Sequence, residues 1–253
     1  MSADDYLQRI LIRESVDTGP FSSVRSVQST LQPLLSHWGA GYLLSVSPSG
    51  SFAKGTANRS GTDIDLFLSV SSQCTNTLKE IYERLYTQMQ NNGLSPRRQN
   101  VSIRVRVNSY DVDLVPGKQQ NPFSLDHSLW RRKAETWTKT NVAEHIKYVQ
   151  NGCRINETRV IKLWRDQKSL DFPSFYLEMV VIEALSTILF DTLANNVWKV
   201  FIYLRDTFSN ARFVDPANTN NIISDDLSST ERAAIKAAAV QALTAKNWDQ
   251  IVT

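Results

Sequence analysis

Two pairs of aspartates, each pair separated by one apolar residue, have the spacing to bind divalent metal ions. The first pair is Asp63 and Asp65, and the second is Asp111 and Asp113. Side chains two residues apart on a β-strand project from the same face, so each pair presents its carboxylates together. Such oxygen-rich clusters suit Mg2+, and a two-metal site can stabilise both the attacking and the leaving oxygen of a displacement. Because like charges this close are costly without a cation, the pattern predicts a metal site.

A glycine–serine turn ahead of the first pair makes this prediction more specific, since an isolated Asp-x-Asp match often arises by chance. Gly50 and Ser51 lie about twelve residues before Asp63, and Lys54 follows them. Where such a turn opens a short helix, its backbone N–H groups and hydroxyl can bind a triphosphate. Gly50 can equally be a turn glycine, and the two interpretations are compatible.

Neighbouring strands are needed to bring these carboxylates together. Apolar or alternating runs predict strands at 42–46, 64–68, 101–107 and 110–115, and helical apolar spacing predicts helices at 20–39 and 76–91. The short Asn108-Ser109 link between the last two strands predicts a hairpin. Two adjacent strands would then place three or four of the aspartates at one spot.

The second half of the chain has a different character. From about residue 141 the pattern is dominated by helices, predicted at 141–150, 155–168, 174–194, 196–208 and 228–245. This order predicts an α/β (α+β) lobe over residues 1–135, followed by an all-α helical lobe over residues 136–253.

Composition limits the kind of protein without identifying it. The chain has 253 residues and a formal net charge of +3, which is too small to indicate a nucleic-acid-binding protein by itself. Cys74 and Cys153 show no pairing pattern, the N-terminus lacks a secretory signal, and no apolar run reaches the length of a membrane helix. We therefore expect a soluble, cytoplasmic protein with no membrane contact.

The motifs around the aspartates together resemble a known signature. Residues 50–56, the Asp63-Ile64-Asp65 pair and the Asp113-Leu114-Val115-Pro116 stretch are similar to the motif of polymerase-β-type nucleotidyltransferases. Within that superfamily the chain is most similar to the oligoadenylate synthetases, the bacterial cyclic-oligonucleotide synthases of anti-phage signalling and the archaeal-type CCA-adding enzymes. The resemblance covers residues 50–230 and implies a nucleotidyltransferase lobe with a mixed twisted sheet, a helical lobe, and an active site in the cleft between them.

The resemblance implies a role for each aspartate. Asp63 and Asp65 would hold two Mg2+ or Mn2+ ions that bridge the triphosphate of an NTP, with ATP as the expected substrate. Asp113 would complete the site by activating the acceptor hydroxyl. Asp111 competes for this last role, and Asp113 is preferred because it stands in the Asp-Leu-Val-Pro pattern. The implied nucleotide-binding loop contains Gly50, Ser51 and Lys54.

The helical lobe carries further resemblances. Residues 156–164 are similar to the helix whose lysine contacts the triphosphate, residues 173–178 to the next helix, and residues 215–218 to a turn that closes the nucleotide pocket. His145 has roughly the place of a nucleotide-contacting histidine in the CCA-adding group. The implied nucleotide contacts are His145, Lys162, Ser174, Tyr176 and Asp215. From the residues alone, Lys162 can be a solvated cation, Tyr176 a core aromatic and His145 a structural histidine.

The acceptor of the transferred nucleotide stays open. The compact chain and small charge favour a synthase of a short linear or cyclic oligonucleotide messenger. The alternative is an RNA 3′-end nucleotidyltransferase acting on tRNA-like ends, although we expect no counterpart of the tail domains of the CCA-adding enzymes. A nucleotidylating toxin and a non-catalytic nucleotide-binding protein are further alternatives. Residues that would either guide a polynucleotide or simply be solvated are Arg97, Arg98, Arg104, Arg106 and the basic triplet 131–133.

Overall fold

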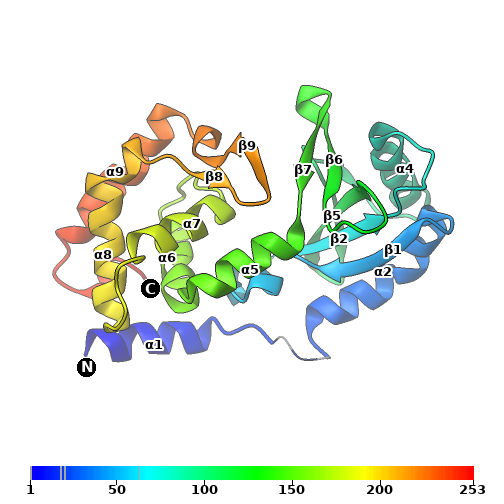
Figure 1. Cartoon of the computed structure of the whole chain (residues 1–253). Helices are drawn as coiled ribbons and strands as arrows, with labels where there is room; N and C mark the ends of the chain where they lie inside the picture. Colours follow the sequence, from blue (N-terminus) through cyan, green and yellow to red (C-terminus); the bar gives the residue numbers. More distant parts are fainter. Residues whose placement is uncertain (1, 18, 20, 62) are drawn as a thin grey trace. The chain divides into compact units, whose positions relative to one another are not determined.

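The computed structural model describes residues 2–17, 19, 21–61 and 63–253, and the chain folds into two compact units (Figure 1). The sheet unit comprises residues 17–54 and 62–146, and the helical unit comprises residues 1–16, 55–61 and 147–253. This division differs from a single boundary at residue 135, because the chain passes between the units more than once. The N-terminal segment and the short segment 55–61 both pack with the C-terminal helices.

A seven-stranded mixed sheet forms the framework of the sheet unit. Its strands are β1 (Leu43–Pro48), β2 (Ile64–Val70), β3 (Arg97–Arg98), β4 (Ile103–Val107), β5 (Tyr110–Gln119), β6 (His127–Arg131) and β7 (Thr136–Thr140). The main path runs β1-β2-β5-β4-β3, with β6 paired to β5 and β7 paired to β6. The β2–β5 pair is parallel, and the other described pairs in this sheet are antiparallel. The mixed sheet implied by the sequence resemblance is confirmed.

Two hairpins illustrate what the sequence pattern does and does not predict. The β4–β5 hairpin turns at Asn108 and Ser109, as predicted, and these residues have φ values of 49° and 73°. Positive φ at both central positions is typical of the type I′ turn, whose twist matches that of paired strands. The β6–β7 hairpin is not predicted, because β7 is a polar Thr-Trp-Thr-Lys-Thr segment of which only the last residue is buried.

Two helices cover one face of the sheet (Figure 1). Helix α2 (Ser23–Gly39) packs against β1 and β2, α4 (Leu78–Asn91) packs against β4, β5 and β6, and the two helices contact each other. Their buried residues recur at helical spacing, as Leu31 and Leu35 do in α2 and Ile81 and Leu85 do in α4. The short helix α3 (Gly50–Lys54) follows β1, and a 3₁₀ turn at Arg132–Ala134 joins β6 to β7. Both long helices start within three residues of the predicted positions.

The helical unit is built around an apolar core with an aromatic centre. Its helices are α1 (Ala3–Arg13), the last turns of α5 (Val142–Gly152), α6 (Ile155–Gln167), α7 (Ser174–Ala184), α8 (Leu193–Asp206) and α9 (Ser229–Leu243). Short 3₁₀ turns lie at Arg59–Gly61, Phe208–Asn210, Ile223–Asp226 and Trp248–Gln250. The hairpin of β8 (Val214–Asp215) and β9 (Asn218–Ile222) adds two short strands to the helical lobe that the sequence predicts. The largest fully buried core side chains include Trp164, Tyr176, Phe201 and Phe208.

Helix α1 is an element that the sequence pattern does not predict. A capping box between Ser2 and Asp5 fixes its start, since the Ser2 hydroxyl accepts a hydrogen bond from the backbone N–H of Asp5 at 3.1 Å. Its apolar side, with Leu7, Ile10 and Leu11, is buried where α1 contacts α6 and α8. This burial explains why the first residues of the chain belong to the helical unit.

The single helix that the sequence predicts over residues 174–194 is wrong at its C-terminal end. Helix α7 ends at Ala184, and α8 begins at Leu193 after a new N-cap. The hydroxyl of Thr192 accepts a hydrogen bond from the backbone N–H of Asn195 at 3.3 Å, which fixes that start. Leu189 and Phe190 extend the apolar pattern of the sequence, yet they are 83% and 96% exposed and contribute nothing to the core.

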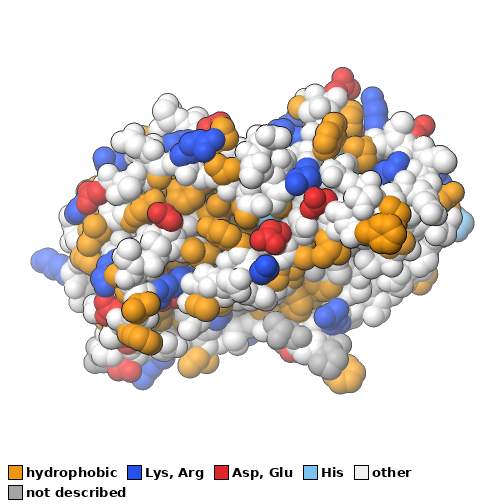
Figure 2. Space-filling model, in the orientation of Figure 1, with side chains coloured by type: hydrophobic (Ala, Val, Ile, Leu, Met, Phe, Trp, Pro, Cys, Tyr) orange, Lys and Arg blue, Asp and Glu red, His pale blue; other side chains and the backbone are white. Residues whose placement is uncertain are grey.

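The surface of the described residues bears on the binding of membranes and of polyanions. No helix among the described residues combines the length and the apolar character needed to cross a membrane. On the face drawn in Figure 2, Lys and Arg side chains are scattered among polar and apolar ones. This scatter agrees with the small net charge of the sequence.

Candidate active site

Two of the predicted catalytic aspartates lie side by side on the sheet. Asp65 on β2 and Asp113 on β5 are register partners in the parallel pair. Register partners on neighbouring strands project from the same face, and such strands lie about 4.8 Å apart. The apolar neighbours Ile64 and Leu114 are 0% exposed and project from the opposite face. The alternation in the sequence therefore brings these two carboxylates together.

Arg104 lies on the other side of Asp113. It is on β4, directly opposite Asp113 in the antiparallel β4–β5 pair. Its Nε donates to Asp113 Oδ1 at 3.0 Å and its Nη2 donates to Asp113 Oδ2 at 2.7 Å, which makes a bidentate ion pair. The same Nη2 donates to Asp63 Oδ2 at 2.7 Å. One guanidinium group thus bridges two of the three predicted aspartates.

The three bridged side chains differ in their exposure to solvent. The Asp113 side chain is 12% exposed, that of Arg104 is 29% exposed and that of Asp63 is 52% exposed. Gln99 also donates from Nε2 to Asp113 Oδ1 at 3.0 Å, so Asp113 is the most constrained of the group. Hydrogen bonding to Asp113 raises the pKa of Arg104 further above its usual range, against the opposing effect of desolvation. Arg104 therefore stays charged.

The three predicted aspartates are linked two at a time, and they do not surround a single ion-binding position. Among the residues that the structure describes, no three His, Cys, Asp or Glu side chains are grouped closely enough to hold one ion. Asp65 is joined to Asp113 by strand register, and Asp113 is joined to Asp63 by Arg104. The guanidinium group explains this arrangement, because it occupies carboxylate oxygens of both Asp63 and Asp113. Asp111, the competitor of Asp113, lies two residues away on β5.

The glycine of the predicted phosphate loop lies against Asp65. Gly50 opens α3 with a φ of +55°. A Cβ atom at this position would lie 1.7 Å from Asp65 Oδ2, so a side chain cannot be added without moving that carboxylate. The backbone N–H of Ser49 donates to the Asp65 carbonyl at 2.8 Å, which fixes the loop to β2.

The other two residues of the predicted loop differ in burial. Ser51 follows Gly50 on α3 and is half-buried, whereas Lys54 at the end of the helix is 8% exposed. Ser51 is therefore next to the residue that contacts Asp65, which is where the sequence motif predicts the phosphate-binding hydroxyl. Direct nucleotide contacts of Ser51 and Lys54 stay predictions.

Lys162 is buried in an ion pair within the helical unit. Its Nζ donates to Glu178 Oε1 at 2.7 Å and to the Thr56 hydroxyl at 3.0 Å. Thr56 also donates to Glu178 Oε1 at 2.6 Å, and Glu178 is 0% exposed. Lys162 itself is 4% exposed, so its interpretation as a solvated surface cation is wrong. The triphosphate contact implied by the resemblance stays a prediction.

Ser174 and Tyr176 lie two residues apart on α7 in different surroundings. Ser174 is exposed, and its hydroxyl accepts a hydrogen bond from Arg165 Nη1 at 2.9 Å. The ring of Tyr176 is fully buried, with centroid distances of 5.4 Å to Phe172 and 5.3 Å to Phe213. Burial raises the pKa of the Tyr176 hydroxyl. This position fits the interpretation of Tyr176 as a core aromatic.

Asp215 stabilises its own turn. Its Oδ1 accepts a hydrogen bond from the backbone N–H of Ala217 at 2.9 Å, and its Oδ2 accepts one from Asn221 Nδ2 at 3.2 Å. The residue is 5% exposed. These contacts show that the carboxylate shapes the β8–β9 hairpin, and its predicted contact with a nucleotide is not tested by them.

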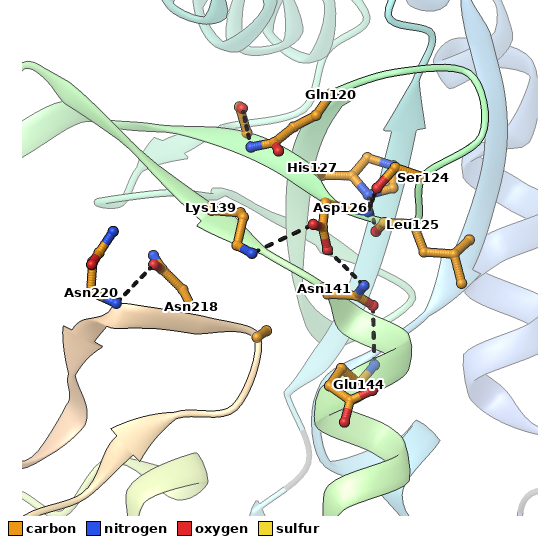
Figure 3. Close-up of polar contacts among 12 residues, drawn as sticks. Gln120, Ser124, Leu125, Asp126, His127, Lys139, Asn141, Glu144, Asn218 and Asn220 are labelled. Carbon is orange, nitrogen blue, oxygen red and sulfur yellow. Dashed lines mark hydrogen bonds and ion pairs between the residues drawn. The ribbon is translucent and has the colours of Figure 1, made fainter.

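The helix that carries His145 begins at a polar network in the sheet unit (Figure 3). Asn141 Oδ1 accepts a hydrogen bond from the backbone N–H of Glu144 at 3.1 Å, and Asn141 Nδ2 donates to Asp126 Oδ1 at 2.8 Å. Lys139 Nζ lies 3.5 Å from Asp126 Oδ2. His145 is half-buried on the first turn of this helix, so the network fixes its backbone position.

Known proteins resemble this chain in sequence and in fold. No protein-family profile matches the chain. A curated protein, the cyclic AMP-AMP-AMP synthase of Escherichia coli (strain MS 115-1), is 24% identical over 210 residues, which cover 75% of this chain. The chain spans 65% of the length of that relative.

Solved structures match almost the whole chain. CdnC of E. coli MS115-1 with ATP matches with a TM-score of 0.76 and 20% identity, covering 98% of this chain and 96% of CdnC. The cyclic dinucleotide synthase CdnE of Elizabethkingia meningoseptica, with GTP and Apcpp, matches with a TM-score of 0.76 and 13% identity, covering 97% and 100%. Cid1 poly(U) polymerase with MgGTP matches with a TM-score of 0.70 and 14% identity, covering 95% and 93%. The chain has the fold of the polymerase-β-type nucleotidyltransferases.

This nucleotidyltransferase fold confirms the resemblance seen in the sequence, including the similarity to bacterial cyclic-oligonucleotide synthases. The sequence interpretation misses Gln99, which contacts Asp113, and Glu178, which contacts Lys162. It also misses the contacts of Arg104 with Asp63 and Asp113. A signal for Arg104 was available in the hairpin itself. Counting equal numbers of residues back from the Asn108-Ser109 turn pairs position 104 with position 113. Glu178 has no comparable signal, because helical spacing does not reveal which residue of another helix it meets.

A buried histidine in the seven-stranded sheet predicts pH-dependent stability (Figure 3). His127 Nδ1 donates to the Leu125 carbonyl at 2.8 Å. This leaves Nε2 to accept a hydrogen bond from the Ser69 hydroxyl at 2.8 Å. Desolvation lowers the pKa of His127 below its usual value of 6.5. Between the lowered pKa of the folded chain and the pKa of about 6.5 of the unfolded chain, the unfolded chain binds a proton that the folded chain does not. The contribution of His127 to the free energy of unfolding is therefore fully present above about pH 6.5 and is lost as the pH falls below that value. Urea unfolding roughly one pH unit on either side of 6.5 checks this. The loss should be smaller in His127→Gln, and an equal loss in both proteins contradicts the assignment.

Proposed function

We propose that this chain is a metal-dependent nucleotidyltransferase that moves a nucleoside monophosphate from an NTP to a hydroxyl acceptor, and that it makes a short or cyclic oligonucleotide. The observation that carries the proposal is the pairing of Asp65 with Asp113 on parallel strands, with Gly50 against Asp65. The names of two relatives support the product class, since one is a cyclic AMP-AMP-AMP synthase and the other a cyclic dinucleotide synthase. ATP is the substrate that we propose to test first.

The carboxylates fit Mg2+ or Mn2+ as the metal. Mg2+ is commonly held by one or two protein carboxylates together with water and substrate phosphates. Asp65 and Asp113 offer neighbouring oxygen ligands, and Asp63 offers another from the residue just before β2. We propose that these three residues hold two ions. When bound, the ions would neutralise phosphate charge and lower the pKa of the acceptor hydroxyl.

Asp113 is the residue that we assign to the acceptor hydroxyl. Gln99 holds its carboxylate through a hydrogen bond to Oδ1, and its side chain is largely shielded from solvent. A carboxylate held in this way can accept the hydroxyl proton while the oxygen attacks the α-phosphorus and pyrophosphate leaves. Gly50 and Ser51 would orient the triphosphate through their backbone N–H groups.

The remaining predicted nucleotide contacts fall into two groups. Ser174 is exposed and His145 is half-buried, so their side chains can reach a ligand at the surface. Lys162, Tyr176 and Asp215 are buried among contacts of their own chain. We propose direct nucleotide contact for the first group, and for the second group we propose that they shape the elements beside the nucleotide.

RNA 3′-end nucleotidyl transfer is the second candidate function. The likeness to Cid1 poly(U) polymerase, with a TM-score of 0.70, favours it. The arginines that would guide a polynucleotide are partly engaged elsewhere. Arg104 binds two aspartates, and Arg98 forms an ion pair with Glu83 at 2.7 Å. These contacts favour the oligonucleotide synthase.

Incubation with labelled NTPs decides between these functions. Each NTP is supplied with Mg2+ or Mn2+, with and without RNA, and products are separated by length. We expect oligonucleotide products in the absence of RNA. Label found only at RNA 3′ ends would support the second candidate instead. Failure to incorporate any NTP with either metal would contradict both and leave a non-catalytic nucleotide-binding protein.

Gly50→Ala is expected to reduce nucleotide incorporation at least roughly tenfold, because the new methyl group must displace the Asp65 carboxylate. Gly93→Ala is the matched control, since Gly93 also has positive φ (79°) but a Cβ there meets nothing within 4 Å. The control separates backbone strain from the collision with Asp65. Incorporation assays together with thermal melts measure both effects, and an equal loss of activity in the two variants would contradict the proposed contact.

A further inference from the structure

We propose that Arg104 competes with the divalent cation for Asp63 and Asp113, so that metal binding requires this guanidinium group to release their oxygens. The inference rests on the proposed function, because it concerns the same carboxylates. It adds an element that regulates when the site can take up metal. Its basis is the set of contacts that Arg104 makes with the two aspartates.

The position of Arg104 follows from strand pairing rather than from a flexible surface contact. Arg104 is the register partner of Asp113, and its neighbours Ile103 and Val105 are 0% and 1% exposed in the sheet core. The backbone of both residues is therefore fixed. The bidentate contact to Asp113 then leaves Nη2 close enough to reach Asp63 as well.

The oxygens that Arg104 uses are those that a cation needs. Both oxygens of Asp113 and Oδ2 of Asp63 accept hydrogen bonds from this one side chain. Asp63 Oδ2 and Asp113 Oδ2 share Nη2 at 2.7 Å each, so a single cation can reach both. An ion placed there would meet a guanidinium charge at short range, in a partly buried region where the repulsion is weakly screened.

This arrangement predicts that the free protein binds metal less tightly than its carboxylates alone would allow. Arg104 already neutralises part of their negative charge before a cation arrives. A nucleotide triphosphate brings additional oxygen ligands for the ion, which favours the ion over the guanidinium group. Metal uptake would thereby be coupled to nucleotide binding.

The test is Mn2+ binding to the full chain without nucleotide, measured by titration calorimetry. Arg104→Gln is expected to bind Mn2+ roughly tenfold more tightly than the wild type, because the competing charge is gone. Arg106→Gln is the matched control. It removes the same charge from the same face of β4, two residues away and opposite Asp111. We expect the Mn2+ affinity of this control to stay within about threefold of the wild type.

The outcomes separate this inference from the proposed function. Equal or weaker Mn2+ binding by Arg104→Gln overturns the inference, and the proposed metal site survives if Asp113→Asn binds Mn2+ more weakly than the wild type. If Asp113→Asn binds Mn2+ as tightly as the wild type, the proposed metal site fails as well. Should Arg104→Gln not fold, Arg104→Met provides the same test, because methionine also removes the competing charge and keeps an unbranched stem of similar width. Its Mn2+ affinity should lie above that of the wild type, and an unchanged affinity overturns the inference.

Discussion

Asp113→Asn should lower nucleotide incorporation by roughly a thousandfold or more, because the amide can neither take the hydroxyl proton nor ligate a cation with full charge. The side chain keeps its shape, and Arg104 still has Asp63 as a partner at 2.7 Å. The fold should therefore survive. Incorporation of labelled ATP with Mn2+ measures the activity, and the thermal melting temperature reports the fold.

Asp111→Asn is the control for that substitution. Asp111 lies on the same face of the same strand, two residues from Asp113, and the sequence alone leaves it as a competitor for the role. We expect its activity to stay within about threefold of the wild type, since Asp111 pairs in register with Arg106 and not with β2. A large loss in Asp111→Asn together with an active Asp113→Asn would reverse the assignment.

Lys162→Met should destabilise the chain by about 3–5 kcal/mol, because it leaves the carboxylate of Glu178 buried without its cation. A change of that size corresponds to a fall of roughly 10 °C in melting temperature for a chain of this length. Urea unfolding and thermal melts measure it. The reason for the large effect is the complete burial of Glu178, whose Oε1 accepts hydrogen bonds from both Lys162 and Thr56.

The double variant Lys162→Met with Glu178→Leu is the control for Lys162. Replacing both charges with apolar side chains also removes the buried carboxylate, so most of the lost stability should return. Unchanged stability of Lys162→Met with a selective loss of ATP affinity would contradict the buried ion pair. That result would show instead that Lys162 leaves Glu178 to contact the triphosphate.

The features predictable from the sequence are those governed by local periodicity. Alternation around Asp65 and Asp113 predicts which face each carboxylate takes, because a strand has a fixed two-residue repeat. The Asn108-Ser109 link predicts its hairpin, since few residues adopt the two positive φ values that the turn needs. The glycine–serine motif likewise predicts a loop near Asp65, which Gly50 contacts.

Features that depend on distant partners are not predictable from the same patterns. The sequence shows that Lys162 is a cation on a predicted helix. Its burial, however, depends on contacts with Glu178, sixteen residues later, and with Thr56 in a separate segment. The helix predicted over 174–194 follows an apolar run, and only the fold shows that Leu189 and Phe190 are exposed. Arg104 illustrates the intermediate case, because hairpin counting pairs it with Asp113 while its contact with Asp63 needs the folded sheet.

Pyrophosphate release is the measurement that tests the proposed reaction most directly. The purified chain is incubated with ATP and Mn2+, and pyrophosphate is counted against nucleotides joined by phosphodiester bonds. We predict one pyrophosphate for each phosphodiester bond formed, and no product from Asp65→Ala. Release of inorganic phosphate without joined nucleotides, or equal product from Asp65→Ala, would contradict the account.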